Sequence, residues 1–354
     1  MRNPIMKMED IAKLAGVSKS AVSFAFSGKP GISPETRERI LQIAQESGYL
    51  PRAKSPSIDH TAKSLTFLVI SNSGIVLEQF YQQPFFRELI QFIEERCRTK
   101  GYSLLFSSID MEFLERDIRM VAEEKKSNGV VLLGTNLNKE QIADIANKLQ
   151  SHLVVLDTCF DTLPIHFVEI NNFMGAYQAG THLCEIGHTD IGYIESNVRI
   201  HNFEERKRGF TAAIQEHGRE ILNTHKFSVA PTILSSQDSL KAQLLAFLKE
   251  GHRLPTALFC ECDYIAISAM KTLQELGYRI PDDVSVIGFD NISEAVIVSP
   301  ELTTVHVEKQ RMAYLAVDLL IESIELEQSA GTKIKVDTHF IERLSSRANL
   351  ASIN

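Results

Sequence analysis

The feature that most constrains the fold of this chain is a regular alternation of apolar and helical segments that begins near residue 65. The first series has apolar runs at 65–70, 102–106, 130–133 and 153–156 and helical segments at 85–99, 111–125 and 139–150, and the second has apolar runs at 167–170, 191–194, 257–260 and 284–287. Such alternation is typical of parallel sheets, in which crossover helices connect successive strands. We therefore expect two doubly wound α/β lobes, which bind ligands at the carboxyl ends of their strands.

The first 50 residues lack this alternation and instead predict three short helices. A helix over 8–15 stops at Gly16, a second over 19–26 follows the candidate N-cap Ser18, and a third begins at Pro34. Two short helices joined by a tight glycine turn and braced by a third form a helix-turn-helix unit. Three helices of this size also occur as purely structural bundles, so this pattern alone leaves both interpretations open.

The charge of the chain is divided unevenly between this N-terminal segment and the rest. Residues 1–54 contain nine basic and five acidic side chains, so the segment carries +4 although the whole chain carries −8. The remainder is therefore acidic, at −12. A basic head on an acidic body indicates that the head meets a polyanion, unless the imbalance is a chance fluctuation in a short segment.

Length and composition narrow the class of protein further. A chain of 354 residues, 44% hydrophobic and 23% charged, is expected to form two or three globular domains. Residues 1–13 lack the apolar run of a secretory signal, and no apolar run is long enough to span a bilayer. The five cysteines are scattered without a CxxC pair, which favours reduced thiols over disulfides or zinc ligands. They are Cys97, Cys159, Cys184, Cys260 and Cys262. We expect a cytoplasmic protein with no metal, no cofactor and no membrane contact.

A doubly wound enzyme is the main alternative class, but its usual motifs are missing from the sequence. There is no GxGxxG after a strand, no GxxxxGK[ST] and no GxSxG. His182 and His188 are six residues apart, a spacing that does not place two metal ligands on one face of a helix. We therefore expect no catalytic residues.

Ordered motifs along nearly the whole chain resemble the lactose/galactose repressor (LacI/GalR) family. In the N-terminal segment they are 10–18 (DIAKLAGVS), 22–23 (VS), 32–37 (ISPETR) and 48–51 (GYLP). In the rest they are 84–89 (PFFREL), 185–188 (EIGH), 206–210 (RKRGF), 255–257 (PTA), 280–290 (IPDDVSVIGFD) and 302–305 (LTTV). So many motifs in the family's order make the resemblance highly specific.

The resemblance implies a sequence-specific transcriptional repressor that binds a pseudo-palindromic DNA operator as a homodimer. A small-molecule effector, a sugar or related metabolite, would bind between two lobes and control operator affinity. The implied helix-turn-helix domain covers 1–51, the hinge 52–64 and the effector-binding domain 65–346, followed by a tail at 347–354. This domain would resemble periplasmic binding proteins, with a first lobe at 65–165 and 293–328 and a second at 166–292 and 329–346.

The resemblance also implies particular DNA contacts in the head. Lys19, Ser20 and Phe24 match base-reading positions, and Ser18, Ser23, Ser33 and Thr36 match positions that bind phosphate. Phe24 departs from the family, which usually has a guanine-reading arginine there. Its ring could contact a thymine methyl group or pack inside the head.

The hinge departs most from the family. Ile58 occupies the position of a leucine that inserts into the central minor groove, but Pro56 interrupts the linker. Proline inside a helix costs roughly 3 kcal/mol. Because Ser55 and Pro56 also form an N-cap and first-position pair, we hypothesise a short hinge helix over 56–62. An irregular hinge is the alternative.

Three carboxylates end strands of the expected lobes, where a cleft ligand would lie. They are Asp157, Asp263 and Asp290, and the resemblance implies effector contacts there and at Phe85, Phe86, Arg199 and Arg206. Carboxylates accept from hydroxyl or ring N–H groups, and arginines donate to ligand oxygens. Asp263 and Asp290 could instead merely cap the helices that follow them.

The sequence leaves several alternatives open. The effector could be a sugar, a sugar phosphate or a purine-like molecule, although the acidic body disfavours a highly anionic ligand. A solute-binding transport receptor shares the two-lobed body, but it would carry a signal peptide and no helix-turn-helix. Repression and activation are not distinguished, because the outcome depends on where the operator lies.

Overall fold

The computed structural model describes residues 8–27, 31–47, 63–77, 79–124, 126–326 and 330–349. The chain forms two compact units, Met1–Ala62 and Lys63–Asn354, which we call the head and the body. The hypothesis about Pro56 and Ile58 lies outside the described residues. Within the described ranges, no helix combines the length and the apolar character needed to cross a membrane.

The head contains the three helices that the sequence predicts. They are α1 (Met8–Ala15), α2 (Lys19–Ser27) and α3 (Pro34–Glu46). Gly16, with φ of 64°, ends α1 in the left-handed conformation that glycine adopts without strain. The helices enclose a small core of mostly short side chains, namely Ile11, Ala12, Ala15, Val22, Ala25, Ile40 and Ala44.

The first lobe of the body is built on a parallel six-stranded sheet in the order β11-β5-β4-β3-β1-β2. Its strands are β1 (Ser64–Ser71), β2 (Ser103–Asp110), β3 (Gly129–Leu133), β4 (His152–Leu156), β5 (His166–Ile170) and β11 (Lys333–Val336). Its helices are α4 (Pro84–Thr99), α5 (Leu114–Glu124), α6 (Lys139–Leu149) and α11 (Lys309–Leu326), with short 3-10 turns η1 (Phe80–Gln82) and η2 (Met111–Phe113). This is the doubly wound architecture expected from the alternation.

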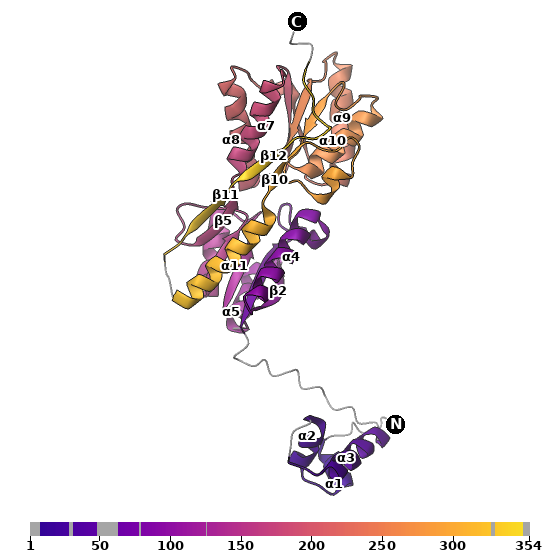
Figure 1. Ribbon diagram of the computed structural model, residues 1–354, viewed down its shortest axis with the longest axis vertical. Helices are drawn as coiled ribbons and strands as arrows, with labels where there is room; N and C mark the ends of the chain where they lie inside the picture. The colour runs from indigo at the N-terminus through magenta and orange to yellow at the C-terminus, as the bar shows by residue number, and fades with distance from the viewer. Residues whose placement is uncertain are drawn as a thin grey trace. The chain divides into compact units, whose positions relative to one another are not determined.

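Both faces of this sheet are covered, which explains why its strands are continuously apolar. Phe67 and Val69 belong to one core cluster and Leu68 and Ile70 to another, as the period of two in a strand requires. Helices α4 and α11 lie side by side on one face (Figure 1), and α5 and α6 pack together on the other.

The second lobe contains a parallel four-stranded sheet in the order β7-β6-β8-β9. Its strands are β6 (Ile191–Ser196), β7 (Lys226–Val229), β8 (Ala257–Cys260) and β9 (Ser285–Ile287), and its helices are α7 (Asn172–Glu185), α8 (His201–Glu216), α9 (Ile233–Lys249) and α10 (Asp263–Glu275), with turns η3 (Asn223–His225) and η4 (Ser293–Val296). An antiparallel pair, β10 (Thr304–Val307) and β12 (Thr338–Ile341), lies against α7.

Sheet pairing corrects the expected boundary between the lobes. The second lobe was expected to begin at residue 166 and to include 329–346, but β5 pairs with β4 and β11 pairs with β5 in the first-lobe sheet. The first lobe was expected to include 293–328, but residues 303–306, at the start of β10, are bridged to β9 and to the loop after it, so 293–307 belongs to the second lobe. The chain therefore passes between the lobes after β5, after β10 and after β11. The sequence did not show this, because a buried parallel strand looks the same in either sheet and only hydrogen bonding assigns it.

Helices α7 and α8 approach each other closely at Gly209. A Cβ atom at this position would lie 2.0 Å from the main-chain oxygen of Phe173. We expect Gly209→Ala to force the helices apart and to lower stability by about 1–3 kcal/mol, which thermal unfolding measures as a drop of several degrees. Arg208→Ala, a change at the neighbouring exposed residue, serves as the control. Unfolding of Gly209→Ala at the wild-type temperature would contradict the close approach.

Candidate functional site

The beginnings of α2 and α3 present exposed hydroxyl groups. Ser18 caps α2 by accepting from the Ala21 amide at 3.2 Å, and its Oγ lies 2.9 Å from Ser20 Oγ. At α3 the Thr36 amide donates to Ser33 Oγ at 3.2 Å, and the two hydroxyls lie 2.8 Å apart. A helix N-terminus has unpaired N–H groups and a positive dipole, which together favour phosphate. The N-terminal ends of α2 and α3 therefore have the chemistry of sites that bind the phosphates of the DNA backbone.

Phe24, in contrast, packs against the head itself. Its residue is half-buried, and a Cβ atom at Gly31 would lie only 3.2 Å from its ring. The main-chain oxygen of Phe24 accepts from Arg37 Nη1 at 3.3 Å. Of the two alternatives for this ring, these contacts favour packing inside the head. Ser23 is likewise half-buried, whereas Lys19 and Ser20 are exposed.

In the body, a small cavity of about 40 Å³ is lined by residues from both lobes. The lining residues are Ile75, Gln83, Phe85, Phe86, Thr135 and Asp157 from the first lobe and Ile200, Asn202, Phe203, Arg206, Pro231, Cys262, Tyr264 and Asp290 from the second. Five of the seven residues expected to contact an effector are among them. The cavity lies at the carboxyl ends of the strands, as a doubly wound fold predicts.

Arg206 is the central cation of this cavity and is only 3% exposed. Its Nε donates to Asn172 Oδ1 at 2.8 Å, and its Nη2 donates to Asp290 Oδ1 at 2.9 Å. Its Nη1 donates to the main-chain oxygen of Glu261 at 2.6 Å, and the ring of Phe289 lies 3.7 Å from the guanidinium. A buried charge is tolerated only when it is paired and hydrogen-bonded in this way.

Asp157 and Asn202 connect the two lobes across the cavity. Asn202 Nδ2 donates to Asp157 Oδ1 at 3.0 Å and to its main-chain oxygen at 3.1 Å, while Thr135 Oγ1 donates to Asp157 Oδ2 at 2.6 Å. Asn202 Oδ1 is buried and has no hydrogen-bond partner among the described residues. An unpaired buried acceptor costs about 1–3 kcal/mol, so this atom favours a donor supplied by a ligand.

Backbone strain also gathers at this cavity. Asp157 has φ of 70° and Asp290 has φ of 115°, in a region that few non-glycine residues adopt. Each such residue costs of order 1–3 kcal/mol, and such residues cluster at ligand-binding sites. Both strained residues line the cavity.

Aromatic side chains form much of the remaining wall. Phe85 and Phe86 are in edge-to-face contact with ring centroids 5.5 Å apart, and Phe203 lies 5.5 Å from the Arg206 guanidinium. Tyr264 of the second lobe accepts from the Phe85 amide of the first at 3.3 Å. The cavity therefore combines apolar ring faces with a few buried polar atoms, the usual composition of a small-molecule site.

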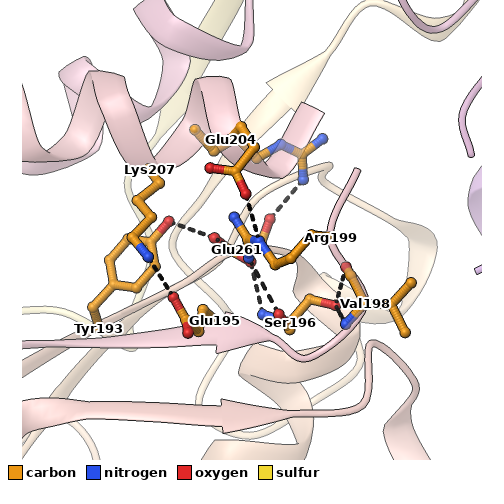
Figure 2. A network of polar contacts seen from close by, with 9 residues as sticks. Tyr193, Glu195, Ser196, Val198, Arg199, Glu204, Lys207 and Glu261 are labelled. Carbon is orange, nitrogen blue, oxygen red and sulfur yellow. Dashed lines mark hydrogen bonds and ion pairs between the residues drawn. The ribbon is translucent and has the colours of Figure 1, made fainter. Parts of the chain in front are cut away.

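Arg199 lies outside the cavity and binds a buried carboxylate instead. Figure 2 shows that Arg199 lies between Glu261 and Glu204, with its Nη1 2.7 Å from Glu261 Oε2 and its Nε 2.8 Å from Glu204 Oε1. Tyr193 and the Ser196 amide donate to the same Glu261 carboxylate at 2.8 and 2.7 Å. This network fixes the loop that leads into α8, and so it supports the residues of the cavity wall.

Asp263 also lies outside the cavity and is fully buried. Its Oδ1 accepts from Thr304 Oγ1 at 2.6 Å and its Oδ2 accepts from the Ile292 amide at 3.0 Å. It therefore ties the start of α10 to β10 and to the loop after β9, and it does not cap α10, which begins after Cys262 without a side-chain cap. Neither arrangement brings Arg199 or Asp263 to the cavity with Asp157, Arg206 and Asp290.

Sequence reasoning missed several lining residues, most clearly Asn202, Phe203 and Tyr264. Asn202 and Phe203 begin the helix that carries Arg206, and helical spacing places residues three and four apart on one face. Tyr264 follows Asp263 directly, but the side chains of neighbouring residues point in different directions. The first signal could have been used, whereas the second requires the structure.

Burial changes the acid–base properties of the cavity. Burial raises the pKa of Asp157 to about 6, against the opposing effects of the Thr135 hydrogen bond and the Arg206 charge. It also raises the pKa of Asp290, although the nearby Arg206 and Lys309 lower it. Outside the cavity, burial raises the pKa of Asp263 to about 7. Desolvation disfavours the charged form of each carboxylate.

Comparison with known proteins identifies the class. Residues 7–52 match the model for bacterial regulatory proteins of the lacI family, and residues 181–346 match the model for a periplasmic binding protein-like domain. A relative named HTH-type transcriptional repressor PurR, from Pasteurella multocida, is 30% identical over 97% of this chain and 99% of its own length. Its namesake from Aliivibrio salmonicida is 31% identical over 90% and 92%.

Solved structures share the fold. The complex of the transcriptional regulator CelR with cellobiose matches with a TM-score of 0.70 and 24% identity, over 96% of this chain and all of that one. The lac repressor dimer bound to operator and the anti-inducer ONPF matches with a TM-score of 0.70 and 20% identity, over 97% of this chain and 99% of that one.

The chain belongs to the LacI family of bacterial regulatory proteins. It is a DNA-binding transcriptional repressor with an effector-binding domain, and, like its relatives, it is a regulator and not an enzyme. The family resemblance, the fold class and the general function expected from the sequence are thus confirmed.

The raised pKa of Asp157 predicts a pH-dependent cost. Since the folded pKa of about 6 exceeds the unfolded value of about 3.9, the folded state binds more protons between these values, and stability falls as pH rises through them. We expect Asp157→Asn to remove this cost and to raise the melting temperature above about pH 6. The gain corresponds to at most about 3 kcal/mol and disappears near pH 4.

Asp283→Asn is the matched control. Hydrogen bonds from Arg279 lower the pKa of Asp283 to about 2, so its charged form stabilises the fold and its loss brings no gain at neutral pH. Melting temperatures of Asp157→Asn that follow the wild type at every pH would contradict the interpretation.

Proposed function

We propose that this repressor binds a small neutral ring molecule, a sugar or related metabolite, in the cavity between its lobes, and that occupancy of the cavity changes its affinity for operator DNA. The observation that carries the proposal is the buried cluster of Asp157, Asn202, Arg206 and Asp290, drawn from both lobes around one cavity. Its unpaired acceptor, Asn202 Oδ1, favours a donor that none of the described residues supplies.

The chemistry of the wall supports this class of effector. Carboxylate and amide oxygens accept from hydroxyl or N–H groups, and the two carboxylates outnumber the single guanidinium, which disfavours a polyanion. The rings of Phe85, Phe86 and Phe203 offer flat apolar faces to a ring-shaped ligand. Cellobiose in the CelR complex, a protein of the same fold, is a ligand of this kind.

Binding requires the lobes to separate. The cavity of about 40 Å³ is far smaller than the roughly 300–1,000 Å³ of typical ligand pockets. Entry of a ring molecule therefore has to break the contacts of Asn202 with Asp157 and of Tyr264 with Phe85. A ligand that stabilises one lobe arrangement can change DNA affinity only through that difference, and such couplings are typically about 1–3 kcal/mol.

For the DNA-binding side, we propose a homodimer that acts in the cytoplasm on a pseudo-palindromic operator. Ser18, Ser33 and Thr36 would contact phosphates from helix N-termini, and Lys19 and Ser20 would reach base edges in the major groove. Phe24 would hold the head together, since its ring packs against Gly31.

A thermal-shift screen of sugars, sugar phosphates and purines tests the effector class, because a ligand of the native state raises its melting temperature. We expect neutral ring molecules to give the largest shifts. With the compound found, Asp290→Asn should bind at least tenfold more weakly, since it loses a charge-assisted hydrogen bond. Asp282→Asn, on the surface of the same lobe, should bind normally.

Two outcomes would count against this assignment. One is wild-type ligand affinity in Asp290→Asn. The other is a screen in which only polyanions stabilise the protein. Should Asp290→Asn fail to fold because Arg206 loses its partner, Asn202→Ala removes only a neutral amide and replaces it in the test.

Lys19→Ala tests the head. Loss of a base-edge contact typically costs about 1–3 kcal/mol, so we expect operator affinity to fall roughly tenfold to a hundredfold in a gel-shift or anisotropy titration. Ligand affinity of the DNA-free protein should be unchanged. A variant that binds operator as tightly as the wild type would show that Lys19 does not contact the bases.

A further inference from the structure

The residue expected to read bases is held by an acid of the neighbouring helix. Lys19 Nζ lies 2.7 Å from Glu9 Oε1, and the two side chains are 62% and 61% exposed. Glu9 is in the first turn of α1 and Lys19 begins α2. The hydrogen bond and the charge of Glu9 raise the pKa of Lys19, so the ammonium is charged and partnered in the free head.

With Lys19 as the proposed base reader, this pairing places Glu9 at the same surface of the head. In a helix-turn-helix unit the start of the second helix enters the major groove, while the first helix crosses the backbone. A carboxylate within contact distance of the Lys19 ammonium therefore meets the same stretch of duplex. There it must remain paired with Lys19, accept from a base amino group, or face phosphates that repel it.

Two arginines of the head, Arg37 and Arg39, point donors inward. Arg39 Nη2 donates to the main-chain oxygen of Ala15 at 2.8 Å, and Arg37 Nη1 donates to that of Phe24 at 3.3 Å. These bonds cap the ends of α1 and α2. At the start of α2, by contrast, the ammonium of Lys19 is exposed and is paired with Glu9.

We propose that Glu9 is a specificity-determining residue of the DNA-binding head. Its carboxylate keeps Lys19 directed at base edges and withholds the lysine charge from phosphates, so that non-specific binding is weakened more than operator binding. The inference rests on the proposed role of Lys19 as a base reader. Specificity is a difference of affinities, and a device that penalises the wrong partner raises it as effectively as a new contact with the right one.

Counterion release makes the proposal quantitative. Each phosphate that a cation neutralises adds about 0.9 to the slope of log affinity against log salt. If Glu9→Gln frees Lys19 for one phosphate, the slope for a mixed-sequence 30-base-pair duplex should steepen by about 0.9. At about 0.1 M salt this corresponds to an affinity gain of up to about eightfold.

The experiment compares full-length wild type, Glu9→Gln and Glu46→Gln on two probes. One probe is the mixed-sequence duplex, and the other is the sequence that the wild type selects from a random library. Glu46→Gln removes the same charge from the far end of α3, so it controls for net charge. We expect Glu9→Gln alone to gain affinity for the mixed duplex and to lose several-fold in its ratio of selected to mixed affinity.

Three other outcomes would contradict the inference, and each has a different meaning. Equal salt slopes for Glu9→Gln and Glu46→Gln would mean that Glu9 acts only as an acid at a helix N-terminus. A loss of affinity for the selected sequence with no change on the mixed duplex would mean that Glu9 reads a base itself. Failure of the wild type to select any sequence would instead remove the proposed function, whatever the variants do.

Discussion

The structure of the effector-binding domain depends on the burial of one guanidinium. A buried cation without partners is strongly destabilising, and Arg206 is satisfied only where the start of α7, the end of β8 and the loop after β9 converge. One of the three acceptors comes from Asp290, whose backbone has a positive φ of 115°. The polar groups at this end of the cavity are thus the acceptors that the Arg206 guanidinium requires.

Several of the polar contacts between the two lobes lie at the cavity, and this explains how a small ligand could act on them. Asn202 and Tyr264 hydrogen-bond across the cavity to Asp157 and to the Phe85 amide. Beside them, Lys309 of α11 in the first lobe donates to the main-chain oxygens of Asp290 and Asn291 in the second. Two effects raise the free energy of Asp157 in the folded state: desolvation of its carboxylate and the positive φ of its backbone. A ligand that relieves these costs while displacing the contacts would shift the balance between closed and open lobes by a few kcal/mol.

Much of this could be predicted from the sequence, because the dominant signals are local. The strand and helix alternation gives the doubly wound lobes, and the position of Asp157 and Asp290 after strands gives their place at the cavity. Long-range pairing is not local: β5 reads as second-lobe sequence but pairs with β4. Arg199 was misplaced for a similar reason, since its partner Glu261 is 62 residues away and competes with any ligand. Asn202 was missed because asparagine is common near the start of a helix, so its presence there does not indicate a ligand site.

If occupancy of the cavity changes the DNA affinity of the head, ligand and operator binding are thermodynamically linked, and this linkage can be measured. Operator affinity is measured with and without saturating ligand, and ligand affinity with and without operator. We expect both affinities to change by the same factor, within about 5- to 150-fold, because coupling between two binding sites is reciprocal. Operator affinity that stays constant while the ligand saturates the cavity would contradict this linkage.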